Sequence, residues 1–213
     1  MKERLTRAQK RERTYEGLIS AAERLFTERG FHASTVDEIA FEAGCTKGAV
    51  YSNFASKEDL FFAVYERRAE WALAGIEEVL SENGPAAGLE LLASEAARRR
   101  CGADDGWLAV FFEFWAHVVR RPELRDRFAK IHGRALEPMA AALERFAGER
   151  GISIPVEARS LNVAMNAMVL GLSLERLTQP DAVDGGLGAR MVRLVLEDLE
   201  RGGFVGASED RKE

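Results

Sequence analysis

The sequence predicts an all-α fold of about nine helices, on three observations. Apolar residues recur at three- and four-residue intervals along most of the chain, as in Leu18, Ala22, Leu25 and Phe26, and this spacing gives a helix one apolar face. Alternating apolar and polar runs, which would indicate strands, are nearly absent. Gly and Pro residues fall where one helix would end and the next begin. Hydrophobic residues make up 46% of the 213, which is enough for a sizeable core.

The first part of the chain predicts three helices in close succession. Thr14 is placed to cap the first helix. Thr35 and Glu38 form a Thr-x-x-Glu capping box that opens a short second helix, and Gly44 allows the left-handed residue that ends it. Thr46 then caps a third helix.

The remaining helices are longer. Ser56 and Asp59 open a fourth helix, which breaks at Asn83-Gly84-Pro85 because Gly ends a helix and Pro suits the first turn of the next. Further helices are expected at about 85–101, 105–120, 122–150, 155–178 and 186–202. We therefore predict an N-terminal arm and three-helix helix-turn-helix domain at 1–60, a C-terminal helical domain at 61–205, and a disordered tail at 206–213.

Charge is unevenly distributed along the chain. The net charge is −5, yet residues 1–14 hold six basic and two acidic side chains, a local balance of +4. Binding to nucleic acid depends on the cations that touch phosphates, so a basic arm is compatible with it despite the acidic total. A short charged N-terminus also suits a solvated tail, and both interpretations stay open.

Composition argues against several classes of protein. The chain has no run of about 18 apolar residues and no secretory signal, so we expect a cytoplasmic protein without a membrane span. The two cysteines, Cys45 and Cys101, and the three histidines have no metal-binding spacing. Neither a nucleophile motif nor a glycine-rich phosphate loop stands out. The sequence therefore predicts no enzyme, no cofactor and no metal.

The third helix suits the major groove of DNA, which is about 12 Å wide. Two short helices joined by a turn that contains Gly are typical of a helix-turn-helix. Gly48 would let the backbone approach the DNA, and Ala49 or the methyl of Thr46 could meet a thymine methyl. Ser52 and Asn53 offer hydrogen bonds further along the helix.

Other side chains nearby suit phosphates. Tyr51 and Lys57 could each reach a backbone oxygen of DNA, and Ser34 and Thr35 stand beside the amides that begin the second helix. Any one of these residues could instead serve only as a helix cap and make no contact with DNA. The candidate DNA-binding set is Ser34, Thr35, Thr46, Lys47, Gly48, Ala49, Tyr51, Ser52, Asn53 and Lys57.

Residues 14–60 closely resemble the DNA-binding domain of the TetR family of bacterial transcriptional regulators. The matching pattern is Thr35-Val36-x-x-Ile39-Ala40-x-x-Ala43-Gly44-x-Thr46-x-Gly48-x-x-Tyr51-x-x-Phe54-x-x-Lys57-x-x-Leu60. The resemblance implies a homodimer on a two-fold operator. It also implies that 61–205 is a C-terminal helical ligand-binding and dimerisation domain, to which an effector binds. Many relatives carry an aromatic-His pair where this chain has Ser52-Asn53, so their operator sequences should not be transferred.

The helix expected at 105–120 is apolar around nearly its whole circumference, so it is either solid core or one wall of a pocket for a hydrophobic effector. Candidate pocket residues are Trp107, Phe111, Phe114, Trp115, His132, Asn162 and Asn166. His132 alone also suits a surface or capping role. Glu113 and His117 are expected to form an ordinary i, i+4 pair.

The helices near 155–178 and 186–202 are too apolar to face solvent. By the resemblance they would meet their symmetry mates in a four-helix dimer interface; burial within one chain is the alternative. The sequence thus predicts a homodimeric repressor that binds a palindromic operator in double-stranded DNA and is released by a small-molecule effector. A ligand-independent helical DNA-binding or adaptor protein is the alternative.

Overall fold

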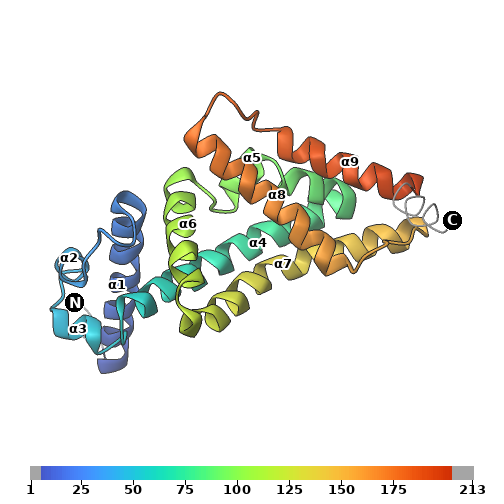
Figure 1. The fold of residues 1–213 in the computed structure, drawn as a ribbon. Coiled ribbons are helices and arrows are strands. Elements are labelled where there is room, and N and C mark those ends of the chain that lie inside the picture. The colour runs from blue at the N-terminus through green and yellow to red at the C-terminus, as the bar shows by residue number, and fades with distance from the viewer. Residues whose placement is uncertain (1–5, 203–213) are drawn as a thin grey trace. The chain divides into compact units, whose positions relative to one another are not determined.

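The computed structural model describes residues 6–202, and it confirms the all-α prediction (Figure 1). Nine helices and no strand lie within that range. The helices are α1 (Arg7–Arg29), α2 (Val36–Glu42), α3 (Lys47–Tyr51), α4 (Lys57–Leu92), α5 (Glu95–Arg100), α6 (Asp105–Val119), α7 (Pro122–Arg150), α8 (Ala158–Thr178) and α9 (Leu187–Arg201). The predicted tail at 206–213 lies outside the described residues.

The helices form two compact units that alternate along the sequence. The first unit comprises the chain up to Arg68 together with Gly106–Phe128. The second comprises Ala69–Asp105 and the chain from Ala129 onward. Almost all of α6 therefore belongs to the same unit as α1, α2 and α3, although it lies far from them in sequence.

The prediction that Thr14 caps the first helix is wrong. α1 begins two turns earlier, at Thr6, whose hydroxyl accepts from the Gln9 amide while the Gln9 side chain accepts from the Thr6 amide. Thr14 has Gly17 three residues on and cannot form such a reciprocal box. It lies inside the helix, where its hydroxyl donates to the Lys10 carbonyl at 3.0 Å.

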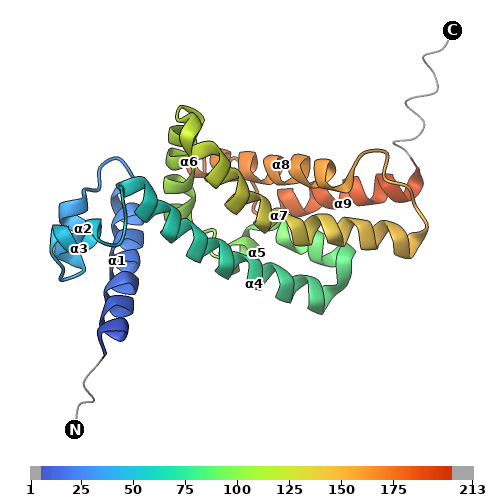
Figure 2. The same ribbon diagram turned by 90° about the horizontal axis from the view of Figure 1, so that it is seen from below.

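Aromatic rings fill the core of the first unit. Phe61 of α4 stacks on Phe114 of α6 with ring centroids 3.9 Å apart. Phe31 packs against both of these rings, and Phe26 packs against Phe61. All four side chains are 1% exposed or less. Figure 2 shows α2 and α3 beside α1. Because α1 contributes Phe26 to this core, the core supports the helix against which the short helices pack.

A glycine bends α4 within the second unit, as the sequence predicts. Gly84 adopts a φ of 74°, and helical residues resume at Pro85. The expected single helix over 85–101 is wrong, however, because the chain turns at Ala93 and restarts at α5. Ser94 causes the restart: its hydroxyl accepts from the Ala97 amide at 3.3 Å.

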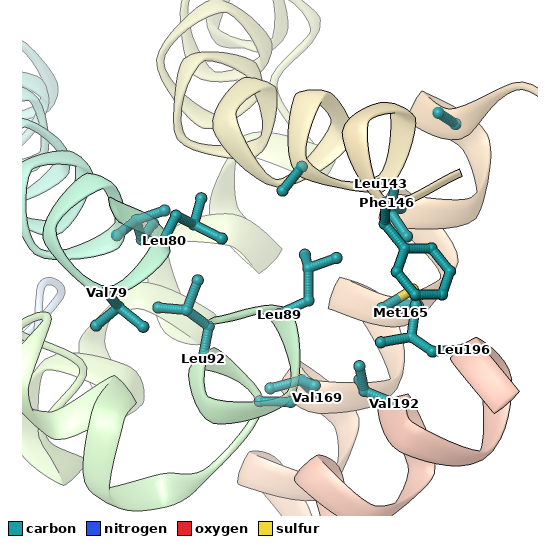
Figure 3. Packing of buried hydrophobic residues seen from close by; sticks show 14 of the residues in the cluster. Val79, Leu80, Leu89, Leu92, Leu143, Phe146, Met165, Val169, Val192 and Leu196 are labelled. Carbon is teal, nitrogen blue, oxygen red and sulfur yellow. The ribbon is translucent and has the colours of Figure 1, made fainter. Parts of the chain in front are cut away.

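The core of the second unit is aliphatic rather than aromatic (Figure 3). Leu89 and Leu92 from the end of α4 meet Leu143 and Phe146 of α7, with α8 and α9 closing the cluster. The two units therefore differ in the chemistry of their cores.

Candidate nucleic-acid interface

Local caps fix the geometry of α2 and α3. Thr35 Oγ1 accepts from the Glu38 amide at 3.2 Å, and Glu38 Oε2 accepts from the Thr35 amide at 2.9 Å. The Thr35 hydroxyl also donates to Glu38 Oε2 at 2.8 Å, and this bond, together with that from the Thr35 amide, holds the pKa of Glu38 below its usual range. Gly44 takes a φ of 63° after α2, and Thr46 Oγ1 accepts from the Ala49 amide at 3.2 Å. The predicted capping box, left-handed glycine and third-helix cap are all confirmed.

α3 turns two apolar residues inward and a polar face outward. Val50 is 1% exposed and Phe54, just after the helix, is 5% exposed. The ring of Phe54 stacks on Tyr15 of α1, with centroids 5.1 Å apart. The opposite side of the segment is open to solvent. Its exposed residues are Thr46, Lys47, Gly48, Tyr51 and Ser52, while Ala49 and Asn53 are half-buried.

Neither packing nor backbone conformation within the protein requires glycine at position 48. A Cβ built on it would meet only Thr46 Oγ1, at 3.8 Å, and its φ is not positive. Glycine within a helix costs about 1 kcal/mol relative to alanine, so the residue weakens α3 without improving its packing. Close approach of an external molecule is the remaining use for a bare backbone at this position.

Three polar side chains on or just after α3 have partners within α2 and α3. Ser52 Oγ and Asn53 Nδ2 both donate to the Ala49 carbonyl, at 2.9 and 2.7 Å. Lys47 Nζ lies 2.7 Å from Asp37 Oδ2 of α2, and this carboxylate raises the pKa of the lysine. Lys47 and Ser52 are exposed and Asn53 is half-buried, so each could exchange its present partner for DNA at modest cost.

Two of the candidate phosphate ligands have their polar groups turned inward. Ser34 is 1% exposed, and its hydroxyl donates to the carbonyls of Leu25 and Gly30. Lys57 Nζ donates to the carbonyls of Phe31 and Ser34 at 2.9 and 3.1 Å. Desolvation lowers the pKa of Lys57. These side chains therefore brace the link between α1 and α2. Contact with DNA stays a prediction for Ser34 and Lys57, as it does for Thr35 and Tyr51.

Glu113 of α6 supports the link between α1 and α2 from far away in the sequence. Its two carboxylate oxygens accept from the amides of Phe31 and His32, each at 2.8 Å. The expectation that Glu113 pairs with His117 is wrong, since His117 Nε2 lies 3.3 Å from Glu58 instead. About 80 residues separate Glu113 from its partners, so no local pattern could have indicated the contact.

The candidate pocket residues are divided between the two units. Trp107, Phe111, Phe114 and Trp115 belong to the first, where Trp107 and Phe114 both stack on Phe61. The polar candidates belong to the second. They are His132, whose pKa burial lowers, Asn162, whose amide donates to the Leu136 carbonyl at 2.9 Å, and the half-buried Asn166. A role in ligand binding stays a prediction for all seven.

Two further features bear on function. Among residues 6–202, no group of three or more His, Cys, Asp or Glu side chains is arranged to hold a metal ion. None of the helices described combines the length and the apolar character that crossing a membrane requires.

Both the N-terminal and the C-terminal part of the chain match models of known protein families. Residues 18–64 match the model of bacterial regulatory proteins of the tetR family. Residues 85–201, more than half of the chain, match the C-terminal model of BetI-type transcriptional repressors.

Individual relatives agree with these matches. The transcriptional repressor AcnR of Corynebacterium diphtheriae is 30% identical over 60% of each chain. The transcriptional activator FasR of Mycolicibacterium smegmatis is 40% identical over 30% of this chain, which spans only 29% of that relative. The crystal structure of a putative transcriptional regulator from Pseudomonas aeruginosa PAO1 superposes with a TM-score of 0.74 at 20% identity. That superposition covers 95% of this chain and 96% of the other.

Proposed function

The chain belongs to the TetR family of bacterial transcriptional regulators, and we propose that it is a homodimeric repressor whose α3 reads a palindromic operator. The family consists of helix-turn-helix DNA-binding regulators rather than enzymes. What we propose for this chain is the dimer, the two-fold operator and release by a small-molecule effector, all in the bacterial cytoplasm.

The observation that carries the proposal is the outward face of α3. Thr46, Gly48 and Ala49 present a slim surface at the start of the helix, where recognition helices contact base edges. Ser52 and Asn53 follow, with hydrogen-bonding groups that now rest on a carbonyl of their own helix. Lys47 and Tyr51 flank this surface and suit phosphates.

The exposed apolar side chains of α8 and α9 support dimerisation. Val163 and Leu174 of α8 are 48% and 47% exposed, and Met191 and Leu194 of α9 are 37% and 56% exposed. They recur on helices whose other faces are buried in the core of the second unit. A second copy of the chain would cover this stripe in a four-helix arrangement.

A dimer would place its two copies of α3 about 34–36 Å apart, which is one turn of DNA. An effector bound in the C-terminal part would favour a conformation, for example a tilt of α4, in which this spacing no longer fits. A ligand that prefers the non-binding state by roughly 100-fold shifts the equilibrium by about 2.7 kcal/mol. That is enough to empty an operator at moderate repressor levels.

The test starts with selection of genomic fragments by the purified protein, followed by fluorescence anisotropy on the selected site across a salt series. We expect a steep fall of affinity with salt and a preference for the selected site over random DNA. Ser52→Ala and Asn53→Ala should change which bases are preferred. Equal losses on the selected site and on random DNA would remove these two residues from base recognition.

A matched pair of valines tests the dimer. Val163→Glu should yield monomers in light scattering after size exclusion, because it puts a charge into the proposed interface. Val119→Glu is the control, since Val119 of α6 is similarly exposed, at 56%, but lies outside the stripe. Dimers that persist equally in both variants would contradict the interface.

The alternative is a DNA-binding or adaptor protein without an effector. Thermal shift against a library of hydrophobic and cationic compounds, followed by operator release, separates the two. A compound that stabilises the protein and releases the operator supports the repressor.

A further inference from the structure

A small hollow lies in the second unit where α5, α8 and the link between α8 and α9 meet. Its volume is about 20 Å³, above the roughly 10–15 Å³ that one water molecule needs. The link is held in place by the Glu95 amide, which donates to the Gly185 carbonyl at 3.1 Å. Its charged lining residues are Arg98, Arg176, Glu95 and Asp184, and Ser173, Val169 and Leu172 also line it.

Charges around the hollow do not balance. Arg99 and Arg176 share two carboxylates: Arg99 lies 2.8 and 2.9 Å from Glu95 and Asp105, and Arg176 lies 3.3 and 2.7 Å from the same pair. Arg98 is the third guanidinium of the group, and within residues 6–202 it has no carboxylate within 4.0 Å. This cluster of charges beside the hollow therefore holds three positive and two negative groups.

The nearby Asp184 does not supply the missing charge. Its Oδ1 accepts from the Gly186 amide at 2.6 Å and lies 3.3 Å from Arg190, which draws it toward the start of α9. These contacts hold the pKa of Asp184 below its usual range, so it is a paired carboxylate. Adding Asp184 and Arg190 to the count leaves the excess of one positive charge unchanged.

Arg98 is held by neutral acceptors only. One of its terminal nitrogens donates to Ser173 Oγ and, at 3.5 Å, to the Val169 carbonyl. Ser173 is 2% exposed, which shows how far the guanidinium reaches into the unit. Desolvation, followed by repulsion from Arg176, lowers the pKa of Arg98 to about 10. A guanidinium has five donors in a fork that matches carboxylate and phosphate, and this one makes few bonds.

We infer that this hollow binds the anionic head group, a carboxylate or a phosphate, of a small molecule through Arg98 and Ser173. The hollow is little larger than one water molecule, so only oxygens of the head group would enter it and the rest of such a ligand would lie outside. Val169, Leu172 and Val183 make an apolar border that suits an alkyl chain. A cation of similar size is disfavoured by the excess positive charge. The inference does not depend on DNA recognition, and its test uses no DNA, so either proposal can fail without the other.

The experiment measures thermal unfolding and titration calorimetry of the full chain in a Tris–chloride buffer of fixed ionic strength. The probes are sodium octanoate and sodium phosphate, with 1-octanol and choline chloride as the neutral and cationic comparisons. We expect one or both anions to raise the unfolding temperature and the comparisons to leave it unchanged. Octanoate alone would indicate a fatty carboxylate, and phosphate alone a phosphate ester.

Variants assign the effect to the hollow. Arg98→Met should weaken binding of the active anion at least tenfold and, without anion, should unfold at the same or a higher temperature than the parent, because an uncompensated partly buried charge is gone. Arg193→Met is the matched control: it removes the same charge from an exposed arginine that pairs with Glu90, and it should bind normally. Ser173→Ala is the milder second variant, expected to weaken binding several-fold if Arg98→Met does not fold.

Three results would overturn the inference. The parent protein could fail to bind either anion at 10-millimolar-scale concentration, roughly the weakest useful affinity. Arg98→Met and Arg193→Met could respond to the anion equally. Arg98→Met could lose the dimer without any change in anion binding, which would indicate that Arg98 pairs with a carboxylate of a second copy of the chain.

Discussion

The outward face of α3 and the link between α1 and α2 lie in the same unit but are built in opposite ways. On α3 the polar groups are exposed and bond within their own helix or to the neighbouring α2. The link is held from a distance, by Glu113 of α6 on its amides and Lys57 of α4 on its carbonyls. One region is therefore free to bind a partner, while the other supports the fold. Substitutions should distinguish the two regions: those in the link should lower the stability of the protein strongly, and those on α3 should lower it little or not at all.

The largest loss is expected for Gly30→Ala. Gly30 ends α1 with φ 87° and ψ 165°, a conformation nearly restricted to glycine, and a Cβ would lie 2.6 Å from Glu113 Oε2. We expect a loss of about 3 kcal/mol in the free energy of unfolding, measured by urea denaturation.

Gly17→Ala is the control for this substitution. Gly17 lies inside α1 with open space around its Cα, so alanine should be neutral or stabilise the helix by up to about 1 kcal/mol. Equal effects of the two substitutions would contradict the special conformation of the link.

Glu113→Ala should cost somewhat less, about 2 kcal/mol. It leaves the amides of Phe31 and His32 without their charged acceptor, and hydrogen bonds to charged groups contribute about 1.5–3 kcal/mol. Glu113→Gln keeps one acceptor oxygen and should recover part of the loss. If chemical denaturation finds the alanine variant as stable as the parent, the carboxylate does not support the link.

Features that depend on neighbouring residues could be predicted from the sequence. The capping box at Thr35, the left-handed Gly44 and the cap at Thr46 each involve partners within about four residues, and the structure confirms them. The break at Gly84 has the same local origin. The all-α class and the inward direction of Val50 and Phe54 follow from spacing alone.

Features that depend on distant contacts could not be predicted in this way. The motif places Lys57 beside the DNA-binding helices, but only the folded chain brings its ammonium to the carbonyls of Phe31 and Ser34. In the sequence Glu113 has His117 as an i, i+4 partner, but in the fold it accepts from the amides of Phe31 and His32 instead. In the sequence, Arg98 is one of three adjacent arginines on a short helix. Only the fold shows that it has no carboxylate partner, because Arg176 of α8 pairs with the nearby Glu95 and Asp105.

The smallest loss of stability is expected for Lys47→Ala. The Lys47–Asp37 ion pair is more than half exposed on both sides, so its removal should change the free energy of unfolding by no more than about 0.5 kcal/mol. Binding should nevertheless weaken on all DNA sequences, and the slope of affinity against salt should fall by about 1. An unchanged slope in anisotropy titrations would remove Lys47 from the phosphate contacts.

The central claim, that the bare face of α3 approaches DNA, is tested most directly by Gly48→Ala. Because a Cβ meets nothing in the free protein, the variant should be as stable as the parent or more stable by up to about 1 kcal/mol. The measurement is its affinity for the selected operator beside that of Gly17→Ala, which makes the same change away from α3. We predict at least a tenfold loss for Gly48→Ala, about 1.4 kcal/mol, and none for Gly17→Ala. Parental affinity in a folded Gly48→Ala protein would contradict the account.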